Sequence, residues 1–294
     1  MFFGMGLKQT AAQYIDRLGS RLQEAKSRRR PGGFSNFDEE RIIERFAGEL
    51  LPGPGPRTAV DLGAGDGIKG SNTYALFRAG WRGLGVEADP RRARRLAHAY
   101  RGLAGVKARH ARVTPSNVAG LLESNGVRPG FDLLSLDIDS YDYWVLDRLL
   151  EGFRPRLVVT EINEKIPPPI RFVVRFDPDF RLTHHFFGYS IASLEDLAAR
   201  RGYALVELEY NNAFLAPLEL PGVRPLDFTA AYRRGYLERP DRRERFRSNL
   251  DMEDLHTLSP AEGVEFIRRF FACHEGKYDL GLAETPAEAA PARA

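Results

Sequence analysis

The sequence has a single cysteine, Cys273, among 294 residues. One cysteine excludes an intrachain disulfide, and no group of cysteines and histidines has the spacing of a zinc site. Long hydrophobic runs are also absent: the opening MFFGMGLKQT holds none, and no later stretch approaches the ~18 apolar residues of a spanning helix. We therefore expect a cytoplasmic protein with no membrane partner, whose chemistry does not depend on cysteine.

Positive and negative residues are mixed along this chain. The net charge is +3 with a pI near 9.0, and the arginines are scattered among acids rather than gathered in one basic stripe. This distribution gives little indication of nucleic-acid binding. Hydrophobic residues make up 43% of the chain and are spread along most of it, which favours one main globular domain with smaller additions.

Residues 1–56 predict an N-terminal helical region. Apolar residues at helical spacing indicate an amphipathic helix over residues 7–27. The run Arg28–Arg30 that follows is a candidate contact for phosphate or an acidic surface, although a solvated helix end is the simpler interpretation. A second helix is expected from Ser35 to about Leu51, where the run PGPGP ends it.

Residues 57–218 predict a Rossmann-like α/β core. Short apolar runs alternate with helical stretches, as in a parallel sheet with crossover helices. Asn211 and Asn212 suit a tight turn, so the last two strands should form a hairpin that gives this doubly wound, seven-stranded sheet an antiparallel last strand. The helix before the hairpin is expected to have Ser193 as its N-cap and to stop at Gly202. The predicted strands are 58–62, 83–87, 106–113, 131–138, 157–162, 203–210 and 213–217.

Further segments interrupt or follow this core. Residues 167–190, rich in proline and aromatic residues, come just after a predicted strand, and we interpret them as a lid insertion. Their phenylalanines are candidates to line a pocket, although local packing is at least as good an explanation. Residues 219–282 predict a C-terminal helical region, and residues 283–294 predict a disordered tail.

A glycine-rich turn follows the first predicted strand. Gly63, Gly65 and Gly67 alternate, whereas a dinucleotide-binding fingerprint needs its third glycine one place later, where this chain has Ile68. Glycine lets the backbone approach a ligand, and a helix directly after the turn would offer free N–H groups to a carboxylate. A tight turn that needs glycine for structural reasons alone is the competing interpretation.

The next predicted strand ends in Glu87, about 20 residues further on, where a carboxylate can bind a ribose diol. Together, Asp61 to Gly67 and Glu87 resemble the class I S-adenosylmethionine (SAM) methyltransferases, over about residues 58–217. The resemblance implies SAM as cofactor and places Arg112, Val113 or Thr114 beside the adenine. The predicted cofactor residues are Asp61, Gly63, Gly65, Gly67, Ser71, Asn72, Glu87, Ala88, Val113 and Asp137.

Two further strand ends carry polar side chains. Asp137 and Asp139 are two residues apart, as are Glu161 and Asn163, so each pair should lie on one face of the rim where open parallel sheets bind ligands. Oxygen ligands of this kind suit Mg²⁺, which can hold a substrate diol and lower the pKa of its hydroxyl. The alternative is that these acids cap a helix, pair with arginine or remain solvated.

The stretch from Asp137 to Leu146, DIDSYDYWVL, resembles the FkbM-type methyltransferases, with Ser140 in place of their usual glycine. This resemblance implies O-methylation of a sugar or another natural product, with a small molecule as acceptor. Methyl transfer to a hydroxyl needs a base or a metal to remove its proton. Candidates for this catalytic role are Asp137, Asp139, His184 and His185.

Two other functions compete with this hypothesis. A nucleic-acid methyltransferase is suggested by the basic segments 28–30 and 242–247, but an amino-methylating enzyme of that type has an Asn/Asp-Pro-Pro-aromatic motif where this chain has Asp-Ile-Asp-Ser. A non-catalytic scaffold with the same fold would keep the glycines but would not need Glu87, Asp137 and Glu161. The N-terminal helices are candidates for an active-site cover or for a homodimer contact.

Overall fold

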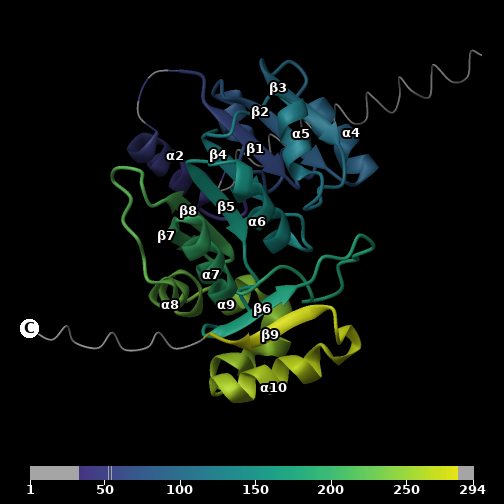
Figure 1. Cartoon of the computed structure of the whole chain (residues 1–294), viewed down its shortest axis with the longest axis vertical. Coiled ribbons are helices and arrows are strands. Elements are labelled where there is room, and N and C mark those ends of the chain that lie inside the picture. Colours follow the sequence, from purple (N-terminus) through teal and green to yellow (C-terminus); the bar gives the residue numbers. More distant parts are fainter. Residues whose placement is uncertain (1–32, 52, 54, 284–294) are drawn as a thin grey trace, which may run out of the picture.

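The computed structural model describes residues 33–51, 53 and 55–283. The helix predicted over residues 7–27, the arginines 28–30 and nearly all of the predicted tail lie outside these residues. Within them, the main sheet has seven strands in the order β3, β2, β1, β4, β5, β8, β7 (Figure 1). The strands are β1 Thr58–Leu62, β2 Arg82–Glu87, β3 Val106–His110, β4 Leu133–Leu136, β5 Leu157–Glu161, β7 Tyr203–Glu209 and β8 Asn212–Pro217.

The predicted fold class is confirmed. Strands β1 to β5 are parallel, and β8 runs antiparallel to both β5 and β7. The strand order reverses at β1, which has β2 on one side and β4 on the other. Open α/β sheets bind ligands beyond the carboxyl ends of the strands at such a reversal.

Helices pack on both faces of this sheet. One apolar cluster joins α2, α3 and α4 to the sheet, and a second joins α5, α6, α7 and α8 to its other face. None of the helices in the described part of the chain is long and apolar enough to cross a membrane. The helices are α2 Glu39–Leu50, α3 Tyr74–Arg78, α4 Pro90–Ala99, α5 Val118–Ser124, α6 Asp142–Gly152, α7 Ile191–Arg201 and α8 Phe228–Tyr232.

A second, two-stranded sheet lies beside the main one, and the sequence did not predict it. Strand β6 (Ile170–Val174), inside the segment interpreted as a lid, pairs antiparallel with β9 (Tyr278–Leu282) of the C-terminal region. Both strands pack with α10 in a third apolar cluster below the main sheet (Figure 1). The remaining C-terminal elements are η1 Arg233–Leu237, α9 Arg242–Arg245, η2 Arg247–His256, α10 Pro260–Phe270 and η3 Ala272–His274.

Three local predictions need correction. Helix α7 is capped by Ser190, not Ser193, because the Ser190 side chain accepts a hydrogen bond from the Ser193 backbone N–H. The β7–β8 turn is Tyr210–Asn211, with Tyr210 in the left-handed conformation (φ 53°), rather than Asn211–Asn212. The helix after the glycine turn begins only at Tyr74, so its N-terminus does not directly follow the glycines.

We predict that Ser190→Ala lowers the free energy of unfolding by about 1–2 kcal/mol, because it removes a helix cap and a buried hydrogen-bonding group. The Ser190 hydroxyl donates to the Ile170 carbonyl (2.7 Å) and accepts from the Phe172 N–H (3.1 Å), so it also fastens β6. Urea denaturation would measure the loss. Ser124→Ala, at an exposed position, is the control and should change stability by less than about 0.5 kcal/mol; equal effects would contradict this role for Ser190.

Candidate active site

A cavity of about 940 Å³ lies at the carboxyl ends of β1, β2 and β4. Nine of the ten predicted cofactor residues line it, and the exception is Gly67. Asp137 and Asp139 also line it, together with Phe180 and Leu182 from the segment interpreted as a lid. The structure therefore brings nine of the predicted cofactor residues, one of which is Asp137, together with Asp139 around one cavity.

The three glycines have different structural roles. Gly63 (φ 92°) packs closely against the backbone that follows the neighbouring strand β4. A Cβ on Gly63 would lie 1.6 Å from the Asp137 carbonyl oxygen. Gly65 (φ 57°) has no heavy atom within 4 Å of such a Cβ, and it faces the cavity. A Cβ on Gly67 would lie 2.7 Å from Leu96, so this glycine allows the turn to pack on α4. Only Gly65 leaves open space for a ligand.

Asp61 is buried at the end of β1 beneath this turn. The Thr73 hydroxyl donates to its carboxylate (2.6 Å), and burial raises the pKa of Asp61 to about 6 despite this bond. Ser71 accepts hydrogen bonds from the N–H groups of Thr73 and Tyr74, which orders the turn before α3. The Asn72 side chain donates to Ser135 of β4 (3.3 Å). These hydrogen bonds hold the polar side chains at the base of the cavity in fixed positions.

Glu87 anchors the opposite side of the glycine turn. One carboxylate oxygen accepts from the Gly65 N–H (2.9 Å) and the other from the Asp89 N–H (2.7 Å). A carboxylate oxygen has two acceptor positions, so each keeps one for a ligand hydroxyl. Val113, after β3, lines the same cavity and accepts a hydrogen bond from the Tyr141 hydroxyl through its carbonyl (3.0 Å).

The acids after β4 and β5 form a cluster. One carboxylate oxygen from each of Asp137, Asp139 and Glu161 lies within 4.8 Å of the others. The third acid after β4, Asp142, instead stabilises the turn before α6. Its carboxylate accepts hydrogen bonds from the N–H groups of Ile138 (2.8 Å) and Ser140 (2.9 Å). Asp139 takes the left-handed conformation of this turn (φ 54°), so Ser140 does not need to be glycine.

Removal from water, more than repulsion between like charges, raises the pKa values of the acids in this cluster. Removal from water, with the neighbouring Asp139 and Asp142 next in effect, raises the pKa of Asp137 to about 8. Burial and then Asp137 raise the pKa of Glu161 well above its usual range. Burial also raises the pKa of Asp139, against the opposing charges of Arg92 and Lys165. At neutral pH the cluster therefore holds a proton or attracts a cation.

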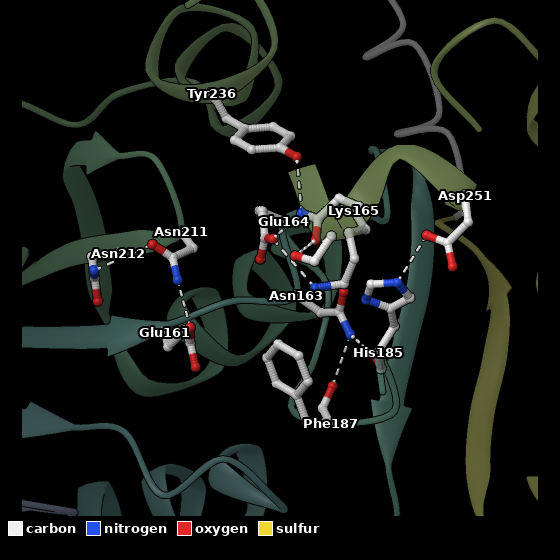
Figure 2. A network of polar contacts seen from close by, with 12 residues as sticks. Glu161, Asn163, Glu164, Lys165, His185, Phe187, Asn211, Asn212, Tyr236 and Asp251 are labelled. Atoms are coloured by element: carbon white, nitrogen blue, oxygen red, sulfur yellow. Dashed lines mark hydrogen bonds and ion pairs between the residues drawn. The ribbon is translucent and has the colours of Figure 1, made fainter. Parts of the chain in front are cut away.

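Asn163, the fourth predicted metal ligand, has partners for its amide nitrogen only, and its buried side-chain oxygen has none among the described residues. Its side-chain amide donates to the carbonyls of His185 and Phe187, both at 2.9 Å (Figure 2). It therefore fixes the segment after β6 to the end of β5. Glu161, in turn, accepts a hydrogen bond from the Asn211 side chain (Figure 2).

The predicted catalytic histidines lie apart from this cavity. Neither His184 nor His185 is among the residues that line it. His185 is buried and hydrogen-bonded to Asp251 (2.9 Å), whereas His184 is exposed. Of the four candidates for a base, the structure places Asp137 and Asp139 on the cavity wall. Among the aromatic residues of this segment, Phe180 lines the cavity, while Phe172 and Phe186 pack in the third apolar cluster.

The cavity also contains residues that sequence reasoning did not identify. Asn36 reaches it from before α2, and the cations Lys69, Arg92 and Arg95 line it from the glycine turn and α4. The arginines stand in the sequence PRRARRLAHA, whose helical spacing could have indicated that Arg92 and Arg95 share a face. Asn36 had no comparable signal, because its place depends on the packing of α2.

No protein-family model and no curated protein sequence matches this chain. Among solved structures, it is similar to a suspected O-methyltransferase from Klebsiella pneumoniae, with 17% identity and a TM-score of 0.44 over 68% of this chain and 88% of that one. It is also similar to the N-terminal domain of EvdMO1, solved with SAH and D-fucose (17% identity, TM-score 0.41, 61% and 82% coverage). A TehB-like SAM-dependent methyltransferase from Corynebacterium glutamicum gives 15% identity and a TM-score of 0.36, with 70% and 96% coverage. Similarity this remote adds nothing to what the sheet and the cavity themselves show.

We predict that alanine at the two neighbouring glycines has unequal effects on stability. Gly63→Ala should lower the free energy of unfolding by about 3 kcal/mol or more, because its Cβ collides with the Asp137 backbone carbonyl just after β4. Gly65→Ala should lower the free energy of unfolding by only about 1–2 kcal/mol, which is the strain of an alanine in the left-handed conformation. Chemical denaturation of both variants would test this, and a Gly65 variant as unstable as the Gly63 variant would contradict the open space at Gly65.

We predict that Asp137 makes stability fall as pH rises. With a folded pKa of about 8 and an ordinary unfolded value near 4, the folded chain holds a proton between these pH values that the unfolded chain has lost. Asp137→Asn should remove this part of the slope and stabilise the protein by about 1 kcal/mol at pH 8, since the cavity is open to water. Unfolding measured from pH 4 to pH 9 would test it; a parallel pH profile in the variant would contradict it.

Proposed function

We propose that this protein is a SAM-dependent methyltransferase of class I, related to the FkbM type. The observation that carries the proposal is that nine residues predicted to bind the cofactor, from four separate stretches of sequence, line one cavity at the strand-order reversal. That position is the usual ligand site of an open α/β sheet.

In this proposal the cofactor spans the cavity from the glycine turn to β3. The ribose hydroxyls donate to Glu87, whose carboxylate is already oriented by the Gly65 and Asp89 N–H groups. The backbone at Gly65 leaves space for the amino-acid end of the cofactor. Val113 lies on the wall where the adenine packs. Lys69, which also lines the cavity, supplies a positive charge for the cofactor carboxylate.

The acceptor is proposed to be a hydroxyl of a small molecule such as a sugar or another natural product. The reacting oxygen must lie in line with the methyl group and must lose its proton. Asp137 is suited to accept this proton, because its raised pKa of about 8 lies near the operating pH. Phe180 and Leu182 then offer an apolar wall for the body of the acceptor.

A divalent cation fits the acidic cluster. Asp137, Asp139 and Glu161 would hold it, because their oxygens converge within 4.8 Å and hard cations such as Mg²⁺ prefer carboxylate ligands. A cation bound there would lower the pKa of an acceptor hydroxyl, and it would then replace Asp137 as the means of removing the hydroxyl proton. Asn163 stays the proposed fourth ligand, because its amide nitrogen donates to the carbonyls of His185 and Phe187 while its buried side-chain oxygen has no hydrogen-bond partner in the described part of the chain.

The same cluster argues against the two competing functions. A scaffold that only keeps the fold has no use for three converging carboxylates that repel one another. A cluster of acids at the cavity also disfavours a polyanionic nucleic acid as acceptor.

We predict that the purified protein binds S-adenosylhomocysteine (SAH) with micromolar affinity in isothermal titration calorimetry, and that Glu87→Ala weakens this binding about tenfold or more. Loss of hydrogen bonds to a charged group commonly costs this much. Glu123→Ala, on the exposed surface of α5, is the matched control and should bind like the wild type.

Circular dichroism on the Glu87 variant would establish that it is folded, because Glu87 also holds the glycine turn. No heat of binding for the wild type would refute the methyltransferase proposal. Undiminished binding by the folded Glu87 variant would refute the cofactor pose.

A further inference from the structure

His184, His185 and Asp251 form a second convergent cluster, outside the cavity. The Nε2 atom of His185 lies 2.9 Å from one carboxylate oxygen of Asp251, and Nδ1 of His184 lies 3.8 Å from the other. One ligand atom from each of the three residues lies within 4.8 Å of the others. Figure 2 shows His185 pointing toward Asp251, which comes from a different part of the chain.

The local backbone brings the two imidazoles together. Side chains of neighbouring residues in an extended chain point in opposite directions. Here the Phe186 N–H donates to the Thr183 carbonyl (2.9 Å), and the tight turn between them puts His184 in the left-handed conformation (φ 41°). The ring centroids of His184 and His185 are consequently only 3.8 Å apart. Strained backbone conformations of this kind are concentrated at functional sites.

The third residue closes the cluster from another element. Asp251 lies in η2, 66 residues after His185, and each of its carboxylate oxygens faces a nitrogen of one ring. The side chain of His185 is 5% exposed, whereas those of His184 and Asp251 are 62% and 44% exposed. One ligand is thus fixed by packing, and the other two remain accessible to an ion from solvent.

The protonation state favours ligation. Burial, and next the charge of Lys165, lower the pKa of His185, against the opposing effect of Asp251. A neutral imidazole and an ionised carboxylate are the forms that bind metal. Lys165 itself is held by Glu164 (3.2 Å) and by the face of the Phe187 ring (4.5 Å).

We propose that His184, His185 and Asp251 form a binding site for Zn²⁺. Two imidazole nitrogens and one carboxylate oxygen suit zinc, whereas Mg²⁺ prefers oxygen ligands alone. Zinc bonds of about 2.0–2.1 Å put tetrahedral ligands about 3.3 Å apart, which the present separations reach with small side-chain rotations. Three protein ligands leave a fourth position for water, on the exposed side next to His184.

A zinc ion in this position fastens the segment after β6 to the C-terminal region. This segment contributes Phe180 and Leu182 to the cavity, and Asn163 already holds it through the carbonyls of His185 and Phe187. The ion itself lies outside the cavity. It therefore affects the positions of Phe180 and Leu182, where the acceptor is proposed to bind, and does not contact the transferred methyl group. The inference does not depend on the proposed methyl transfer.

The test uses Co²⁺ as a spectroscopic probe on the full chain after removal of metals with EDTA. One of the Co²⁺ ions bound by the wild type should give the intense visible bands of four-coordinate cobalt, and Zn²⁺ should abolish these bands. His184→Asn, which suits the left-handed backbone, and Asp251→Asn, which keeps a hydrogen-bonding group, should each weaken Co²⁺ binding about tenfold or more. SAH titration of the same samples reports separately on the cofactor site.

Two control variants locate the ion. His274→Ala removes a histidine that contacts Thr183 (3.1 Å) but is not part of the cluster, and it should leave the cobalt bands unchanged. Asp137→Asn disables the acidic cluster and should also leave them unchanged. Absence of the bands in the wild type, equal affinity in His184→Asn, or their loss in Asp137→Asn would each overturn the proposed zinc site.

Discussion

The site depends on the contact between the backbone at Gly63 and the backbone at Asp137. The Asp137 N–H donates to the Leu62 carbonyl (2.9 Å), and a side chain at Gly63 would collide with the Asp137 carbonyl. Because β1 and β4 are parallel neighbours, this contact sets the glycine turn directly beside the acids. This close approach of two backbone segments thereby positions both the proposed cofactor end and the proposed acceptor end of the cavity.

Electrostatics at this rim oppose folding. Asp137, Asp139 and Glu161 converge although their charges repel, and strongly perturbed carboxyls of this kind are concentrated at functional sites. The opposing charges come from Arg92 and from Lys165, which is itself buried beside Glu164. Asn249 donates to Glu164 (2.6 Å), so the network in Figure 2 joins the end of β5 to the C-terminal region.

The sequence predicted those features that local patterns encode. All seven strands of the main sheet, its antiparallel last strand and nine of the residues around the cavity follow from short apolar runs, glycines and strand-end acids. The pairing of β6 with β9 was not predictable, because its partners are about a hundred residues apart and each strand is only five residues long. Ser190 was overlooked as a cap because Ser193 stands within the same run of suitable residues, and packing alone decides between them.

The roles of histidine and asparagine were the hardest to predict. Both residue types serve catalysis, metal binding and structure, so spacing does not distinguish these uses. His185 faces Asp251 rather than the cavity, because a turn at His184 directs it there. Asn163 holds two carbonyls of the same segment. Both outcomes depend on contacts between distant parts of the chain.

The central claim is that the cavity beside Gly63 and Asp137 holds the S-adenosyl cofactor. A crystal structure of the protein grown with SAH tests it most directly. The account predicts density for SAH at the carboxyl ends of β1 and β2, with the ribose hydroxyls on Glu87 and the adenine beside Val113. Density for SAH at any other place in the molecule, with this cavity filled only by water, would contradict it.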